Sequence, residues 1–183
     1  MKKILFVFLF VFSINLFAED NIKPQEGAFT SLYVSASDVD KYVSFLRSNS
    51  DAFKAIGSSD AGVCITRSGN QYPGQMMIWN AFPSVEAAMI GSLKYNPYKA
   101  KGSISKLRKV KHSTIWKSLK SFRLDPGHEV VGRFKVKQEN IPAFVQAIAS
   151  LEKEIQGNGH PDFFNGVFVS IAGGTESQLS LIH

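Results

Sequence analysis

The stretch that decides the fold of this 183-residue chain is Gln75-Met76-Met77-Ile78-Trp79-Asn80-Ala81-Phe82-Pro83-Ser84. A turn-rich segment precedes it, and its first eight residues are mostly apolar and have the length of a β-strand. Because strand side chains alternate, Met76 and Ile78 would lie on one face. Met77 and Trp79 would lie on the other face, where a half-exposed sheet would carry polar residues. We therefore expect a second sheet to cover that face.

Working outward, residues 30–118 show the order strand, helix, strand, strand, helix, strand. The first helix has apolar residues at i, i+3, i+4 and i+7, which form one helical face, and Ser37 can cap its start. Ser84 can cap the second helix. The apolar residues of the first helix are Val39, Tyr42, Val43 and Leu46, and the predicted strands are 31–35, 62–66, 75–82 and 112–118, with the second helix over 85–93.

Residues 129–183 repeat the first part of this order. Four features recur after 102 to 104 positions: Val34 and Val136, Tyr42 and Phe144, Gly62 and Gly166, and Gln75 and Gln178. We interpret them as a second copy of one unit, the alternative being a chance likeness of two amphipathic segments.

The second copy stops at His183, which aligns with Asn80, so a last helix and strand have no counterpart. Either the sequence is truncated or something else completes the unit. We favour truncation, because a strand at 179–182 that ended the chain would leave an exposed sheet edge.

The order β-α-β-β-α-β is the split βαβ, or ferredoxin-like, arrangement. With the strand Gln75–Asn80 followed by Phe82-Pro83-Ser84, residues 30–118 and in part 129–183 resemble the dimeric α/β-barrel superfamily, which includes the antibiotic-biosynthesis-monooxygenase-like domains. The resemblance rests on the pattern of elements. It implies an α+β fold of tandem ferredoxin-like units that pack sheet to sheet, as an intramolecular pseudo-dimer or a homodimer.

The resemblance also implies a cavity between each sheet and its helices. Some family members oxidise polycyclic substrates without a cofactor, and others degrade haem. No motif in this sequence carries either activity over. The expected organisation is a first unit over 30–123 and a second, incomplete unit over 124–183.

The N-terminus has the order of a secretory signal. Lys2 and Lys3 precede an apolar stretch that ends at the small residue Ala18. An uncleaved membrane anchor is the alternative, but about 20 apolar residues are needed to cross a bilayer, and this stretch is shorter. We expect residues 1–18 to be removed and 19–29 to form a linker. The product would be soluble, without a membrane span, and periplasmic or secreted.

Cys64 is the only cysteine, so no internal disulfide can form and stability must come from an apolar core. It lies in the apolar stretch Gly62-Val63-Cys64-Ile65. We interpret Cys64 as a buried small hydrophobe rather than a reactive thiol.

The sequence contains no G-x-S-x-G elbow, Walker A loop, dinucleotide fingerprint or H-E-x-x-H helix, and its four histidines lack metal-ligand spacing. We expect no metal and no cofactor. Large aromatic residues with one polar group suit a ligand cavity, although such residues belong to the core more often. The candidate ligand residues are Tyr33, Trp79, Asn80, His112 and Trp116, and His112 is also the candidate for a general base.

A basic segment lies between Glu86 and Asp125, where no acidic residue occurs. It could attract an anionic surface or polymer, or it could be a solvated face that aids solubility, which we favour. Because export separates the protein from the cytoplasm, we expect no intracellular nucleic acid as a partner. The candidate anion-binding residues are Lys99, Lys101, Lys106, Arg108, Lys109 and Lys111.

Two functions follow from the sequence. The first is an exported protein that binds a small apolar or aromatic molecule, or an anionic partner. The second is a cofactor-independent, monooxygenase-like enzyme that acts on an aromatic or apolar small molecule. The sequence leaves open whether the protein is an enzyme. The absence of a catalytic motif favours the binding role.

Overall fold

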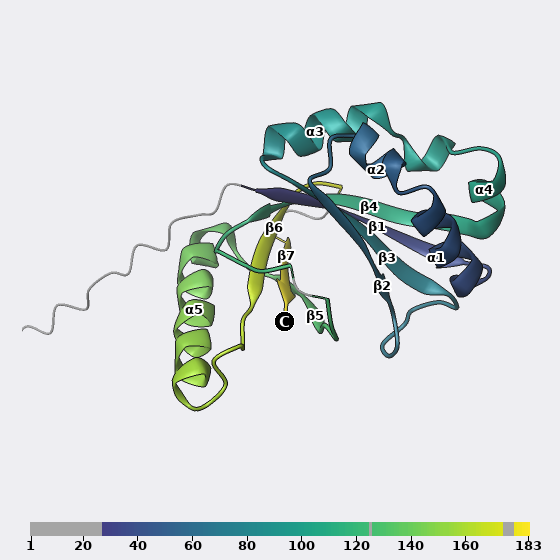
Figure 1. The fold of residues 1–183 in the computed structure, drawn as a ribbon. Helices are drawn as coiled ribbons and strands as arrows, with labels where there is room; N and C mark the ends of the chain where they lie inside the picture. The colour runs from purple at the N-terminus through teal and green to yellow at the C-terminus, as the bar shows by residue number, and fades with distance from the viewer. Residues whose placement is uncertain (1–26, 125, 174–177) are drawn as a thin grey trace, which may run out of the picture.

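The computed structural model describes residues 27–124, 126–173 and 178–183 (Figure 1). The expected signal 1–18 and most of the expected linker 19–29 lie outside these residues. The described chain is α+β and contains one curled antiparallel sheet of seven strands, in the order β2-β3-β1-β4-β6-β7-β5. Among the described residues, no helix is both long enough and apolar enough to cross a membrane.

The first part of the chain supplies four of the strands and most of the helices. Its elements are β1 (Ala28–Ala36), α1 (Val39–Ser48), α2 (Asp51–Ala55), β2 (Asp60–Ile65), β3 (Gln75–Phe82), α3 (Val85–Lys94), η1 (Pro97–Lys99), α4 (Ser103–Leu107) and β4 (Arg108–Ser118). The rest of the chain supplies β5 (Val131–Lys135), η2 (Gln138–Asn140), α5 (Ile141–Gly157), β6 (Gly166–Ala172) and β7 (Gln178–Ile182).

Every predicted strand is present, and β3 has the predicted bounds. Three strands begin earlier than predicted: β1 by three residues, β2 by two and β4 by four. β1 begins at Ala28, so Ala28 and Phe29, placed in the linker by the prediction, are buried strand residues. β4 begins at Arg108 instead of His112, because Val110 faces the helix-side core between exposed lysines.

The helix starts are fixed by side-chain caps. Ser84 caps α3 as predicted, because its hydroxyl accepts a hydrogen bond from Ala87 N at 3.1 Å. The cap of α1 is Asp38 rather than Ser37, and its carboxylate accepts from Lys41 N at 3.0 Å. Ser37 instead donates its hydroxyl to the carbonyl of Leu107 at 3.1 Å. That bond ties the start of α1 to the start of β4.

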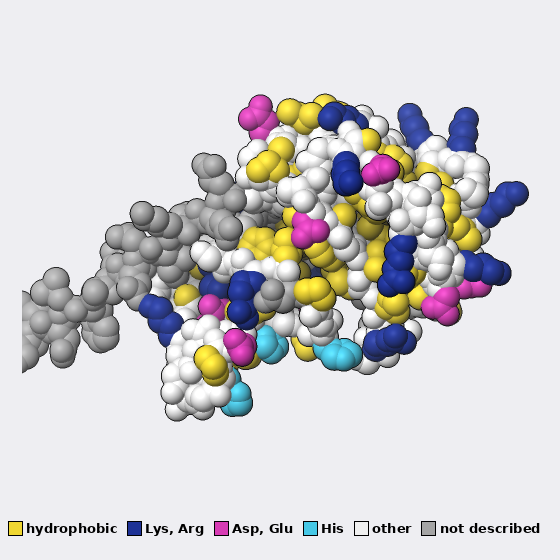
Figure 2. Space-filling view, viewed as in Figure 1, with side chains coloured by type: hydrophobic (Ala, Val, Ile, Leu, Met, Phe, Trp, Pro, Cys, Tyr) yellow, Lys and Arg dark blue, Asp and Glu magenta, His cyan; other side chains and the backbone are white. Residues whose placement is uncertain are grey.

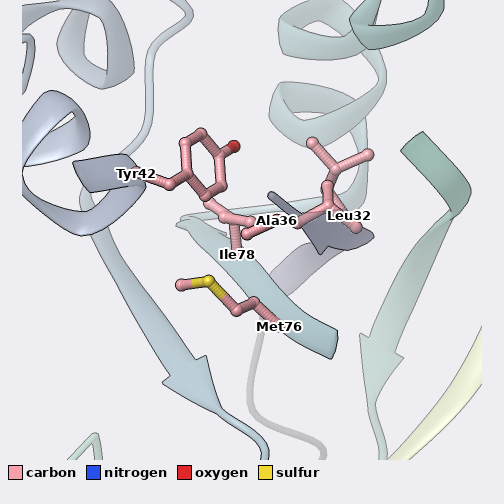
Figure 3. Packing of buried hydrophobic residues seen from close by; sticks show 6 residues of the cluster. Leu32, Ala36, Tyr42, Met76 and Ile78 are labelled. Carbon is pink, nitrogen blue, oxygen red and sulfur yellow. The ribbon is translucent and has the colours of Figure 1, made fainter. Parts of the chain in front are cut away.

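The main core lies between the first four strands and the helices α1 to α4, which Figure 1 shows on one side of those strands. Val34, Tyr42 and Met76 are fully buried there. Figure 3 shows Tyr42 of α1 pointing toward the strand residues Ala36 and Ile78. Burial of such side chains is worth about 1.5–3 kcal/mol each, so this layer is a main source of stability.

The two parts of the sheet are joined edge to edge, where β4 pairs with β6 between Ile115 and Ser118. The sequence pattern predicts two sheets packed face to face, whereas the structure has one continuous sheet. Its curl covers the second face. Arg133 of β5 lies 4.7 Å from the ring of Tyr33 in β1 and 5.3 Å from the ring of Trp116 in β4.

Candidate ligand-binding cavity

A cavity of about 270 Å³ lies on the concave face of the curled sheet. Aromatic rings make up much of its wall, and its charged and polar side chains are exposed, which marks the mouth. The aromatic residues are Phe29, Trp79, Phe122, Phe164 and Phe168, and the charged or polar ones are Arg123, His128, Glu129, Asp162 and His183.

Alternation along the strands gathers the aromatic wall. Phe29 of β1 and Phe168 of β6 meet edge to face with ring centroids 4.7 Å apart. Phe122, from the segment after β4, meets Phe168 in the same way at 4.9 Å. Edge-to-face pairs are favourable beyond the area they bury. The wall therefore joins β1, β6 and the connecting segment into one packed surface.

Two glycines make room for rings of this wall. Gly62 of β2 lies opposite Trp79 of β3, and a Cβ added at Gly62 would stand 2.5 Å from the indole ring. A Cβ added at Gly166 would stand 2.6 Å from the ring of Phe168. Because real Cβ atoms do not approach so closely, each glycine lets a ring lie against bare backbone.

The mouth is built mainly from the segment between β4 and β5 and from the loop before β6. The Arg123 guanidinium donates to the carbonyl of Asp162 at 2.7 Å and lies 4.8 Å from the ring of Phe164. A ring nitrogen of His183, Nδ1, lies 2.9 Å from the carbonyl of Phe164. These contacts hold polar groups around an otherwise apolar pocket.

Cys64 lies beside this mouth. Its thiol donates to Glu129 Oε2 at 3.3 Å, which links β2 to the segment before β5. Burial, and then the negative charge of Glu129, raise the pKa of the Cys64 thiol to about 12. The side chain is half-buried and protonated at neutral pH, as expected of a small hydrophobe that also donates one hydrogen bond.

Of the five predicted ligand residues, Trp79 lines the cavity. Tyr33 and His112 lie elsewhere on the concave face, where their rings stack with centroids 4.6 Å apart beneath Arg133. Burial, and then the charge of Arg133, lower the pKa of His112 below its ordinary value. His112 is therefore neutral near pH 7, and it is not among the residues that line the cavity.

The other two predicted ligand residues have local partners. Trp116 is buried, and its indole N–H donates to Ser31 Oγ at 2.8 Å. Asn80 projects to the opposite, helix-covered face, where its amide donates to Thr30 Oγ1 at 3.2 Å. The structure thus divides the predicted set among the cavity, the core and the far side of the sheet.

The predicted anion-binding residues are divided as well. Arg108 is 8% exposed and donates to the hydroxyls of Tyr42 at 2.7 Å and Tyr95 at 2.5 Å. Its guanidinium therefore fastens α1 and the end of α3 to β4 and is not placed to meet an outside anion. The five lysines of the set, Lys99, Lys101, Lys106, Lys109 and Lys111, are exposed.

The sequence prediction missed most of the cavity. Phe29 was assigned to the linker, and Phe122, His128 and Glu129 lie outside the predicted helices and strands. The available signals were weak: the chain has 15 phenylalanines, and His128 and Glu129 are adjacent after Pro126-Gly127. Within the described ranges, no group of three or more His, Cys, Asp or Glu side chains is arranged to hold a metal ion.

Comparison with known proteins bears on the fold alone. No protein-family model matches the sequence, and no curated protein matches it. Among solved structures, the chain is similar to the "Putative monooxygenase" of Fusobacterium nucleatum subsp. nucleatum, with a TM-score of 0.51 and 12% identity. The likeness covers 86% of this chain and 75% of that one. At this identity the likeness shows a shared fold.

Proposed function

We propose that the cavity binds a small, flat, mostly apolar molecule. The observation that carries the proposal is the wall of packed aromatic rings, which offers apolar contact with polar groups only at the mouth. Small-molecule sites combine these features, and their volumes run from about 300 to 1,000 Å³. At about 270 Å³ the cavity suits a ligand of one or two fused rings.

Two features support a tandem ferredoxin-like origin for this cavity. The order β2-β3-β1-β4 is that of a complete unit, and β6-β7-β5 has the same order without a fourth strand. Gly62 and Gly166 are equivalent positions in the two copies, and each lies against an aromatic ring. In this proposal the cavity lies at the interface between the two units of an intramolecular pseudo-dimer. The proposal also includes export: residues 1–18 act as the signal sequence, and the protein functions outside the cytoplasm.

The test is whether the protein binds 2-naphthol, a two-ring probe. Calorimetry measures the affinity, and thermal unfolding measures the stabilisation by the bound probe. Ala81 lines the cavity, so Ala81→Leu should fill it and weaken binding by about tenfold or more without opening a hole in the core. Ala52→Leu, on the exposed surface of α2, is the matched control and should bind as the wild type does. Saturating probe at 100 times its dissociation constant should stabilise the native state by about 2.7 kcal/mol.

Equal binding by Ala81→Leu and the wild type would place the probe elsewhere and contradict the proposal. So would the absence of binding across a panel of one- and two-ring compounds.

The second candidate is oxygenation of a molecule bound in this cavity, and the fold likeness to the Fusobacterium protein favours it. A balanced reaction without a cofactor oxidises an activated CH₂ group with O₂. One oxygen atom forms the new C=O bond, and the other leaves as water with both hydrogens. His128 and Glu129, at the mouth, are the groups placed to take the first proton.

Oxygen uptake with 2-indanone, whose CH₂ groups are acidic, tests this candidate. Uptake that falls in His128→Gln and Glu129→Gln, while 2-indanone binding persists, would support an enzyme. Binding of 2-indanone without oxygen uptake would contradict the enzymatic candidate and support only the binding function.

A further inference from the structure

The helix α3 presents its large apolar side chains to solvent. Its inward face consists of small residues: Ala88 and Gly91 are buried, and a Cβ at Gly91 would stand 2.7 Å from the ring of Phe82. On the opposite face, Met89, Ile90 and Leu93 are 46%, 48% and 86% exposed. Their spacing continues the i, i+3, i+4, i+7 series from Glu86, so they form one outward stripe.

Lysines extend this stripe on its C-terminal side. Lys94, Lys99, Lys101 and Lys106 are exposed, and Tyr98, 60% exposed, lies among them. Figure 2 shows hydrophobic side chains along the top of the molecule, over α3, and Lys and Arg side chains around α4. Glu86 begins the stripe, and no acidic residue follows it in sequence before Asp125.

We propose that this face, formed by α3, η1 and α4, docks on an anionic phospholipid bilayer. Exposed apolar side chains flanked by lysines are the composition of segments that lie in a membrane interface, where apolar groups enter the acyl boundary and lysines meet lipid phosphates. Tyr98 adds an amphipathic ring suited to the headgroup level.

Charge complementarity selects this occupant. A second copy of the chain would bring Lys94 and its neighbouring lysines against another basic face, and like charges would oppose the contact. A soluble polyanion would satisfy the lysines but would leave Leu93, Ile90 and Met89 in water. An anionic bilayer satisfies both groups at once.

The test is co-sedimentation with vesicles, using protein expressed from the full-length sequence in an exporting bacterium. Vesicles of equal parts phosphatidylcholine and phosphatidylglycerol should bind the protein, and pure phosphatidylcholine should bind it much less. Leu93→Ser with Ile90→Ser should lower the partition coefficient by about tenfold or more. Raising the salt concentration should weaken binding, because surface charges are screened.

Matched controls separate this face from the rest of the chain. Leu151→Ser, an exposed apolar residue of α5, and Lys137→Ser, an exposed lysine, should leave binding unchanged. All variants share residues 1–26, so differences among them report on the folded surface. Circular dichroism should show that each variant is folded.

Three outcomes would overturn the proposal. Vesicle binding that the double variant does not change would assign it to another surface. Retention on heparin that Leu93→Ser leaves intact, without vesicle binding, would assign the lysines to a polymer. A dimer that Leu93→Ser dissociates in the absence of lipid would make the face a subunit contact.

Discussion

Trp79 owes its place in the cavity wall to the glycine opposite it. Gly62 lies across from Trp79 in the β2–β3 pair and has no side chain, so the indole covers its backbone. Trp79 contacts the core formed by Phe29, Trp116 and Phe168. One missing methyl group on a neighbouring strand thereby shapes the wall.

We expect Gly62→Ala to push the Trp79 ring out of the wall. The variant should lose about 1–3 kcal/mol of unfolding free energy through overpacking, show a red shift in tryptophan emission, and bind 2-naphthol less tightly. Fluorescence and chemical denaturation measure these effects. Gly157→Ala, where an added Cβ meets nothing within 4 Å, is the control. Unchanged emission and binding in Gly62→Ala would show that the wall does not depend on this contact.

Cys64 provides a second prediction. Its pKa rises from 9.0 to about 12, so the thiolate fraction at pH 8 is about a thousandfold lower than in the unfolded chain. Iodoacetamide should therefore alkylate the native protein far more slowly than the urea-unfolded protein. Glu129→Gln should speed native alkylation, because the carboxylate is the second cause of the raised pKa.

The raised pKa of the Cys64 thiol also makes the stability of the protein depend on pH in the alkaline range. Above pH 9 the unfolded chain releases the thiol proton while the folded chain keeps it, so this contribution to stability falls as pH rises from about 9 toward 12. Cys64→Ala should remove that part of the pH dependence. Rapid alkylation of native Cys64 at pH 8 would contradict both expectations.

At the scale of elements, α5 is fastened by a buried ion pair. Lys120 Nζ lies 2.9 Å from Glu152 Oε2, and the two side chains are 6% and 17% exposed. Lys120 also donates to the carbonyl of Asn165, and Glu152 accepts from the N–H of Asn165. One network thus joins the segment after β4, the middle of α5 and the start of β6.

Lys120→Met should destabilise the protein by about 3 kcal/mol, because it leaves the Glu152 carboxylate in a poorly solvated place without its cation. Urea unfolding measures the change. Lys54→Met, which breaks the exposed pair with Asp51, should cause no measurable change. Equal losses of unfolding free energy in the two variants would show that the buried ion pair stabilises the protein no more than the exposed one.

At the scale of the whole molecule, the curl of the sheet places Arg133 of β5 over β1 and β4. A guanidinium over two aromatic rings is attracted by both ring faces. The charge of Arg133 also lowers the pKa of His112, whose ring stacks on the ring of Tyr33. The titration of His112 therefore reports on whether the two parts of the sheet stay together.

We expect the pKa of His112, followed by NMR, to lie below 6.5 in the wild type and to rise in Arg133→Ala. Burial, the larger cause, remains in the variant, so the rise should be partial. The folded state disfavours the proton, so His112 contributes stability above pH 6.5 that is lost as pH falls through its lowered pKa. Arg47→Ala, on α1, is the control. An unchanged pKa in Arg133→Ala would mean that β5 does not lie over β1 in solution.

How well the sequence predicts a helix or strand depends on the length of that element and on how regular its apolar pattern is. The strands β3 and β7 and the helix α3 carry clear apolar patterns or caps, and their positions follow from sequence. The helices α2 and α4 have five residues each, too few to show a helical period. The start of β4, Arg108-Lys109-Val110-Lys111, has three basic residues and one apolar one, so composition alone suggested a solvated segment.

The sequence by itself determined the longer elements, such as β3, and their order along the chain, because alternation, helical spacing and caps depend on near neighbours. Only the tertiary structure decided that β4 pairs with β6, that Arg108 is buried between two tyrosines, and that Phe29, Trp79 and Phe168 share one wall. These contacts join residues that lie far apart in the chain. The curl of the sheet sets their distances, and no short pattern in the sequence encodes that curl.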